Sequence, residues 1–248
     1  PVALGKGTKL VDLLTDKEKT YEAVLHLGID TDTQDMSGTV LEEKPVNVTE
    51  EEVRKVLKSF VGEQLQVPPM YSALKVNGKK LYELAREGKT VERKARPVCF
   101  YEIEPLEFHL PLVKIRVTCS KGTYIRTLCH DIGEKLGCGG CMEELLRSRV
   151  GRYSLFESHT LAQVEAAVAD GTVQDMIDPV EAVLAEYPAL YADSYGDRLL
   201  ANGNPLSDNL VRPQHKEGWV RMYASDGTFT GIFQWDAGKK KYYPVKMF

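Results

Sequence analysis

Residues 112–137, LVKIRVTCSKGTYIRTLCHDIGEKLG, contain a strand, a tight turn and a helix in direct succession. The first eight residues alternate between apolar and polar side chains, which predicts a half-buried β-strand. The apolar members of this alternation are Val113, Ile115, Val117 and Cys119. Gly122 allows the backbone to turn. Residues 124–136 are predicted as a helix that stops at Gly137.

The segments before this stretch indicate further elements of the same domain. Residues 20–27, TYEAVLHL, have the composition of a strand. Thr49 is followed three residues later by Glu52, a capping box that predicts the start of a helix. Apolar residues then recur on one face of this helix, at Val53, Val56, Leu57 and Phe60. A further short helix is predicted at residues 160–169.

The character of the chain changes after residue 178. Short strands are predicted at residues 219–223, 228–235 and 241–245, and Asp226-Gly227 is typical of a hairpin turn between the first two. The sequence therefore predicts an α+β protein with a larger first domain, residues 1–178, and a small β-rich second domain, residues 179–248.

Composition excludes several classes of protein. The 248 residues include 32 basic and 36 acidic side chains, a net charge of −4. No apolar run reaches the length of a membrane span, and the five cysteines favour a reducing cytosol over a disulfide scaffold. P-loop, dinucleotide-binding and zinc-protease motifs are absent from the sequence. The charge is nevertheless polarised, because residues 71–96 are strongly basic and residues 155–210 are strongly acidic.

The start of the helix predicted at residues 124–136 offers the first candidate site. Tyr124 and Arg126 lie in the first turn of this helix, beside free backbone N–H groups. Arg126 could orient a carboxylate through a bidentate pair, or it could form an ordinary stabilising salt bridge. Tyr21, early in the first strand, could serve a site or could simply pack in the core.

The basic segment offers a candidate nucleic-acid surface. Tyrosines alternate with lysines and arginines here, and aromatic rings stack on splayed RNA bases while cations track phosphates. An Asn77-Gly78 turn favours a protruding loop. The alternative is a solvated amphipathic face with ordinary surface charges. The residues predicted to bind RNA are Lys75, Lys79, Lys80 and Arg86.

Two further motifs receive plainer interpretations. Cys138-Gly-Gly-Cys141 could suggest zinc or redox chemistry, but a structural zinc site needs four ligands and no thioredoxin-like pattern surrounds the motif. Its glycines fit a tight helix terminus better. Leu145 and Leu146, which precede two arginines, are typical of a helix face.

Five segments together resemble the TruB family of tRNA pseudouridine synthases, in the family's own order. From the first to the last they span nearly all of residues 1–150, and their combination is far more specific than any one of them. The segment GWVRMYASDGTFTGIFQW resembles the small PUA-type RNA-binding domain of bacterial members. The five matching segments are LGKGTKL, KTYEAVLHLGIDTDTQD, VPPMYSALKVNGKKLYELAREG, CSKGTYIRTLCHDIGEKLGCGG and LLRSRVG.

The resemblance implies a pseudouridine synthase catalytic domain with a mixed, mostly antiparallel sheet, followed by a PUA-like domain. It implies a cytoplasmic isomerase that needs no cofactor, no metal and no obligate protein partner. Family members convert the T-loop uridine of tRNA, position 55, to pseudouridine. The nucleotide flips into a pocket, an aspartate acts as nucleophile, the N-glycosidic bond breaks, and C5 of the uracil rejoins the ribose.

The resemblance also implies roles for single residues. Arg126 would pair with the nucleophilic aspartate, and Tyr21 would stack on the flipped uracil. Tyr124 and Leu145 would line the uridine pocket. The basic segment would clamp the T-arm.

One part of the family pattern is not found in the printed residues. The nucleophile belongs to a Gly-His-Thr-Gly-Thr-Leu-Asp-Pro-type motif just before the segment that matches PVALGKGTKL, and Asp12, Asp16 and Asp30 do not match it. We therefore expect a catalytic domain without its N-terminal segment, an inactive printed chain and an active natural protein. The alternatives are a non-catalytic tRNA- or RNA-binding protein and a zinc-stapled binding domain.

Overall fold

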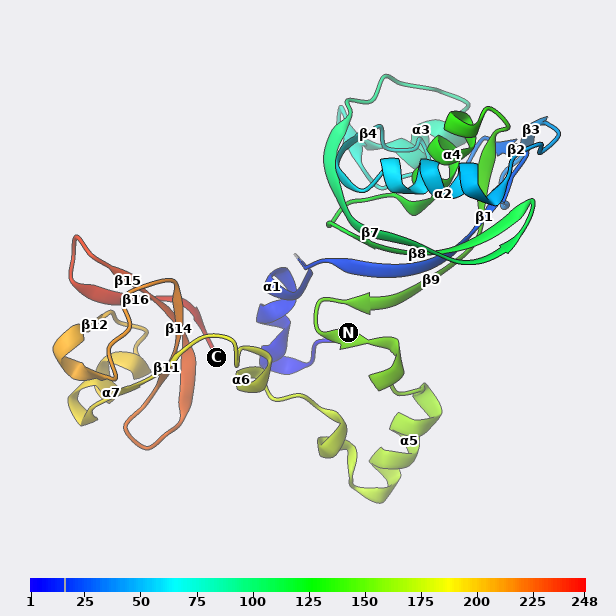
Figure 1. The fold of residues 1–248 in the computed structure, drawn as a ribbon. Helices are drawn as coiled ribbons and strands as arrows, with labels where there is room; N and C mark the ends of the chain where they lie inside the picture. Colours follow the sequence, from blue (N-terminus) through cyan, green and yellow to red (C-terminus); the bar gives the residue numbers. More distant parts are fainter. Residues whose placement is uncertain (16) are drawn as a thin grey trace. The chain divides into compact units, whose positions relative to one another are not determined.

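The chain forms two compact units (Figure 1). The computed structural model describes residues 1–15 and 17–248, so Asp16 lies outside the described residues. One unit is continuous, Leu14–Ser158, and the other combines Pro1–Leu13 with His159–Phe248. This division rests on packing contacts, and the domain boundary expected after residue 178 stays a prediction.

A six-stranded antiparallel sheet forms the centre of the Leu14–Ser158 unit. Its strands, in spatial order, are β10 (Tyr153–Ser154), β9 (Gly140–Val150), β1 (Lys19–Leu27), β8 (Leu112–Cys119), β7 (Arg96–His109) and β4 (Gly62–Gln66). β8 has the alternating burial that its sequence predicts, with every second residue fully buried. Because β1 pairs with both β8 and β9, it occupies the middle of the sheet.

Two helices cover one face of this sheet, α2 (Glu50–Ser59) and α4 (Ile125–Leu136) (Figure 1). The capping box at Thr49 and Glu52 is present, which confirms the predicted start of α2. α4 begins one residue later than predicted and ends, as predicted, at Gly137 in a left-handed conformation. Apolar residues of both helices and of the buried strand faces form one core.

Short elements complete this unit. Asn77 and Gly78 both have positive φ angles, so the predicted turn forms a two-residue hairpin. The predicted helix after this hairpin is also present. The short elements are β2 (Ile29–Thr31), β3 (Val40–Glu43), β5 (Lys75–Val76), β6 (Lys79–Lys80), α3 (Leu81–Arg86) and η2 (Leu155–Glu157). α1 (Val11–Thr15) spans the point where the chain passes between the units.

The other unit contains the second six-stranded sheet, which has its own core. The order of its strands is β12 (Leu206–Ser207), β16 (Lys241–Met247), β15 (Phe229–Asp236), β14 (Trp219–Tyr223), β11 (Ala189–Ala192) and β13 (Val211–Arg212). β11 and β14 are parallel, and the other neighbours are antiparallel. Its helices are η1 (Gly5–Leu10), α5 (Leu161–Asp170), η3 (Val173–Met176), α6 (Val180–Val183), α7 (Ser194–Ala201) and η4 (Asp208–Leu210).

The predicted fold class is confirmed, because both units combine helices with mostly antiparallel sheets and the C-terminal part is rich in strands. The predicted helix around Leu145 and Leu146 is wrong, since both residues lie in β9. β9 pairs with β1 over most of its length, and this tertiary pairing overrides the local pattern.

Candidate functional site

The first turn of α4 follows β8 closely and is fixed by a distant side chain. Gly122 adopts a positive φ of 83° in the turn, and Tyr124 occupies the N-cap position. The carboxamide of Gln66, the last residue of β4, accepts a hydrogen bond from the Tyr124 N–H at 2.9 Å. It also donates one to the Tyr124 carbonyl at 3.1 Å. The side chain of Arg126, two residues further on, therefore extends from a helix start whose main chain is fixed by Gln66.

Arg126 makes two contacts that come from distant parts of the unit. One guanidinium nitrogen donates to Asp35 Oδ2 at 3.0 Å, and the other donates to the Tyr71 carbonyl at 2.7 Å. The side chains of Arg126 and Asp35 are only 24% and 15% exposed, so solvent screens this pair less than a surface pair. Arg126 contacts the Asp35 carboxylate through one nitrogen only, because it divides its donors between the two partners.

The loop after β2 presents Asp35 to the arginine. Thr33 Oγ1 donates to Asp35 Oδ1 at 2.9 Å, and the Ser37 N–H donates to the same oxygen at 3.1 Å. Two backbone hydrogen bonds to Met142 attach the loop to β9. Burial by itself would raise the pKa of Asp35, but the bonds from Ser37 and Thr33, with the charge of Arg126, hold that pKa below its ordinary value. Asp35 is therefore an ionised partner at neutral pH.

Sequence analysis did not single out Asp35 or Gln66. Asp35 lies in the matching segment KTYEAVLHLGIDTDTQD, where a run of Thr and Asp residues was the available signal for a hydrogen-bonded loop. Gln66 ends a short edge strand, and nothing in its local pattern indicates a partner 58 residues away.

Tyr21 lies on the helix-covered face of β1 and packs partly against the core. Its neighbours across the sheet are Val117 on β8 and Arg147 on β9. Burial raises the pKa of its hydroxyl, Cys119 acts in the same direction, and the charge of Arg147 and its hydrogen bond oppose them. The structure thus shows that Tyr21 contributes to core packing. Stacking of its ring on the substrate base stays a prediction.

Leu145 lies opposite Ala23 in the register of β1 with β9, and its side chain is 45% exposed. It lines a pocket of about 400 Å³, together with residues of β1, β8 and β9. The structure brings Arg126, Asp35 and Tyr71 together, and Tyr124 precedes Arg126 by two residues at the start of α4. Tyr21 and Leu145 occupy neighbouring strands of the same sheet.

The four residues predicted to bind RNA surround the β5–β6 hairpin and α3. Lys75, Lys79 and Arg86 are exposed, and Lys80 is partly exposed. Lys80 Nζ and the Arg86 guanidinium lie 5.3 Å and 5.4 Å from the centre of the Tyr82 ring. Lys79 forms an exposed ion pair with Glu87 at 3.4 Å. Two of the four basic side chains, Lys80 and Arg86, therefore share the partly exposed ring of Tyr82.

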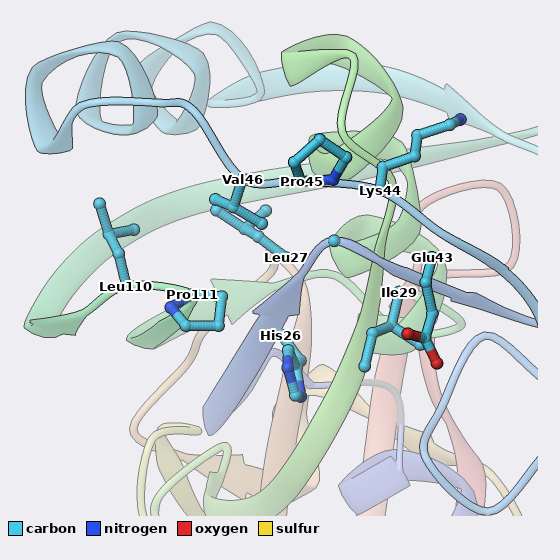
Figure 2. Close-up of a pocket in the computed structure, with 10 residues that line it drawn as sticks. His26, Leu27, Ile29, Glu43, Lys44, Pro45, Val46, Leu110 and Pro111 are labelled. Carbon is cyan, nitrogen blue, oxygen red and sulfur yellow. The ribbon is translucent and has the colours of Figure 1, made fainter.

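Another pocket, of about 590 Å³, lies at the opposite end of β1 from Tyr21 (Figure 2). Leu110, Pro111 and Val46 lie on one side of it in this view, and Ile29 and Glu43 lie on the other. None of the predicted site residues lines this pocket.

The first half of the CGGC motif closes the end of α4, as its plainer interpretation predicts, whereas Gly140 and Cys141 begin β9. The N–H groups of Cys138 and Gly139 both donate to the Gly133 carbonyl. Burial raises the pKa of Cys138, and it raises the pKa of Cys141 to about 11, so both thiols are protonated at neutral pH. Within residues 1–15 and 17–248, no three His, Cys, Asp or Glu side chains are grouped to hold a metal ion.

In the part of the chain that the structure describes, no helix has the length and apolar character that a membrane span requires.

Comparison with solved structures identifies the class of this fold. It matches a chain in the crystal structure of a Cbf5-Nop10-Gar1 complex with a TM-score of 0.70 and 25% identity. That match covers 100% of this chain and 71% of the other. A second match, with a TM-score of 0.68 and 22% identity, is to an H/ACA RNP bound to a substrate RNA containing 2′-deoxyuridine. The architecture is therefore a mixed α+β pseudouridine synthase fold.

Sequence comparisons give the family. Residues 1–125 match the TruB family pseudouridylate synthase N-terminal domain, and residues 126–185 match the tRNA pseudouridylate synthase B C-terminal domain. tRNA pseudouridine synthase B of Lachnoclostridium phytofermentans is 47% identical over 261 residues, covering 100% of this chain and 85% of the relative. The same enzyme of Clostridium novyi is 44% identical over 233 residues, covering 94% and 79%. The chain belongs to the TruB family of pseudouridylate synthases.

Proposed function

We propose that this protein isomerises uridine to pseudouridine in the T-loop of tRNA, at position 55. The observation that supports this most strongly is Arg126, held in the first turn of α4 by Asp35 and the Tyr71 carbonyl within the matched family segments. A partly buried arginine at a helix start is suited to orient a second carboxylate beside the reacting ribose.

Each predicted residue receives a role in this reaction. The target nucleotide flips out of the T-loop, and its uracil stacks on Tyr21. Tyr124 and Leu145 line the uridine pocket. Arg126 pairs with the nucleophilic aspartate while the N-glycosidic bond breaks and C5 of the uracil bonds to the ribose. The bond from N1 to the ribose breaks and a bond from C5 to the same carbon forms, while C5 loses its proton and N1 gains one, so the reaction is balanced without a cofactor.

Asp35 has a different role in this proposal. It belongs to the loop that holds Arg126, and its carboxylate is already hydrogen-bonded by Thr33, Ser37 and the guanidinium. These bonds lower its nucleophilicity, because they stabilise the charge that an attack would use. The nucleophile is instead the aspartate of the family's Gly-His-Thr-Gly-Thr-Leu-Asp-Pro-type motif, which the printed residues do not include.

The rest of the molecule would bind the tRNA. The β5–β6 hairpin and the following helix supply exposed cations for the T-arm backbone. Residues 1–178 would form the catalytic domain and residues 179–248 a PUA-like RNA-binding domain. We further propose that the protein acts in the cytoplasm without an obligate protein partner.

The direct test uses unmodified tRNA with tritium at C5 of its uracils. Forming pseudouridine replaces the C5–H bond by the bond to ribose, so the tritium is released. The printed chain and its full natural reading frame are incubated with this tRNA and with a control in which cytidine replaces uridine 55. We expect release by the full reading frame from the first tRNA, and loss of that release with the control.

Two other results would contradict the proposal. If neither protein releases tritium while the tRNA is retained on a filter, the protein is a non-catalytic tRNA-binding protein. If the printed chain releases tritium, an aspartate within the 248 residues is the nucleophile, and the motif assignment is wrong.

A further inference from the structure

Gln66 is a buried polar residue that the proposed reaction does not use directly. It is 4% exposed and ends β4, at the edge of the central sheet. Both polar atoms of its carboxamide are hydrogen-bonded to the main chain of Tyr124, at 2.9 Å and 3.1 Å. A single side chain therefore holds the N–H and the carbonyl of one residue, 58 positions away in the sequence.

The held residue is the origin of α4. Tyr124 is the N-cap, and its own side chain makes no capping hydrogen bond. Its carbonyl also accepts the first hydrogen bond of the helix, from the Leu128 N–H at 3.1 Å. The N-cap residue is where the helix begins, so its position and orientation set the direction of the first turn. The Gln66 carboxamide holds that residue by both of its main-chain polar groups and thereby sets this direction.

The chain that follows Gln66 contacts the same turn a second time. Pro68 and Pro69 are buried, and their rings restrict the backbone between Gln66 and Tyr71. The Tyr71 carbonyl then accepts a hydrogen bond from Arg126 at 2.7 Å. Residues 66–71 thus hold α4 at Tyr124 through the main chain and at Arg126 through the side chain.

We infer that Gln66 is a positioning residue, which aims Tyr124 and Arg126 at the substrate by holding the Tyr124 main chain. This inference rests on the proposed function. Gln66 needs no contact with the tRNA, so its loss would slow the chemical step and leave tRNA binding unchanged. A displacement of about 1 Å at a reacting centre lowers rates by roughly 100-fold.

The chain offers a matched control on the same strand. The carboxamide of Gln64 also donates to main-chain carbonyls, those of Ser59 and Phe60, at 3.4 Å and 3.3 Å. These carbonyls belong to the end of α2 and not to α4. Gln64→Met therefore removes main-chain contacts from β4 without releasing the Arg126 turn, whereas Gln66→Met releases it.

The experiment compares these two variants in the full natural reading frame. Steady-state tritium release gives kcat and KM for tRNA, and hydrogen exchange gives the protection of the Tyr124 amide. We expect Gln66→Met to lower kcat by roughly 10- to 100-fold with KM unchanged. It should also speed exchange at Tyr124 by roughly 3- to 10-fold, the effect of one lost hydrogen bond. Gln64→Met should change neither quantity.

A second substitution treats the two hydrogen bonds separately. Gln66→Glu keeps the acceptor for the Tyr124 N–H but, when ionised, faces the Tyr124 carbonyl with a second acceptor, so it should keep part of the amide protection and lower kcat. Unchanged kcat in Gln66→Met, with faster exchange at Tyr124, would overturn the inference and leave Gln66 a stabilising residue. A wild-type protein without activity would instead overturn the proposed function, and the exchange rates would still report whether Gln66 holds the turn.

Discussion

Arg126 and the cations of the β5–β6 hairpin differ in where their partners come from. Arg126 contacts residues 91 and 55 positions away, and little of it is exposed. Lys79 and Lys80 contact residues 8 and 2 positions away, the first contact exposed and the second partly buried. Distant partners fix a side chain relative to the whole unit, whereas local partners fix it only relative to its own loop.

This difference corresponds to two uses of positive charge. An exposed ion pair contributes little free energy, so a surface lysine can exchange its protein partner for a phosphate at small cost. A partly buried arginine with two fixed acceptors stays in one geometry, as a reacting centre needs. The comparison therefore supports the proposed division of roles, in which Arg126 serves the chemistry and the hairpin attracts RNA without specificity.

The largest effect is expected from Arg126→Lys. A lysine keeps the charge, but its single ammonium group lacks the planar fork that spans Asp35 and the Tyr71 carbonyl. We expect a loss of about 100-fold or more in kcat, the typical effect of removing one donor from a preorganised site. Tritium release under single-turnover conditions measures it, and filter retention of tRNA should stay normal. If Arg126→Lys has activity close to wild type, Arg126 does not differ in function from the surface cations of the β5–β6 hairpin.

Tyr21→Ala tests whether the helix-covered face of β1 holds the flipped base. Stacking on an aromatic ring contributes about 1–3 kcal/mol per base, so turnover should fall by roughly 10-fold or more. Tyr21→Phe keeps the ring and should retain most of the activity. Thermal unfolding separates this effect from lost packing, because Tyr21 also contacts the core. Unchanged turnover in the alanine variant would remove Tyr21 from the site.

Charge reversal of Lys79 and Lys80 should act on binding alone. Each lost phosphate contact lowers the slope of log K against log salt by about 0.7–0.9, so the double variant should lose up to about 1.8. The matched control reverses two exposed lysines of α2, Lys55 and Lys58. Titrations of tRNA binding at several salt concentrations measure both slopes. Equal slopes for the hairpin variant and wild type would mean that Lys79 and Lys80 do not contact the RNA and are ordinary solvated surface charges.

The smallest effect is expected at Asp35 and depends on pH. Because the pKa of Asp35 is lowered in the folded protein, its ionised form adds stability above the unfolded-state pKa, near 4. That contribution is lost as pH falls through the lower folded-state pKa. In Asp35→Asn the free energy of unfolding should therefore decrease less steeply below about pH 4 than in wild type. Glu102→Gln, at an exposed position, should follow the wild-type curve. Urea unfolding between neutral and acidic pH measures it, and parallel curves for Asp35→Asn and wild type would contradict the linkage.

The same contrast explains what sequence could predict. The strand at 112–119, the capping box of α2 and the Asn-Gly hairpin depend on neighbouring residues, and all three are confirmed. Arg126 could be selected from its place at a helix start, but Asp35 and Gln66 could not be named as its supports. Their contacts with the first turn of α4 arise only from tertiary packing.

Leu145 gives a second example in which the local sequence pattern does not predict the structure. Its leucine pair before two arginines is typical of a helix face, yet pairing with β1 makes this segment a strand. A strand places Leu145 and Leu146 on opposite faces of the sheet, so only one of them can share a face with Tyr21.

The most direct test is a structure of the full natural reading frame bound to a tRNA T-arm. We predict that the ring of the target uracil lies against Tyr21 and that its ribose lies beside the Arg126 guanidinium. A target uracil seated instead in the pocket lined by His26 and Pro111, at the other end of β1, would contradict the account.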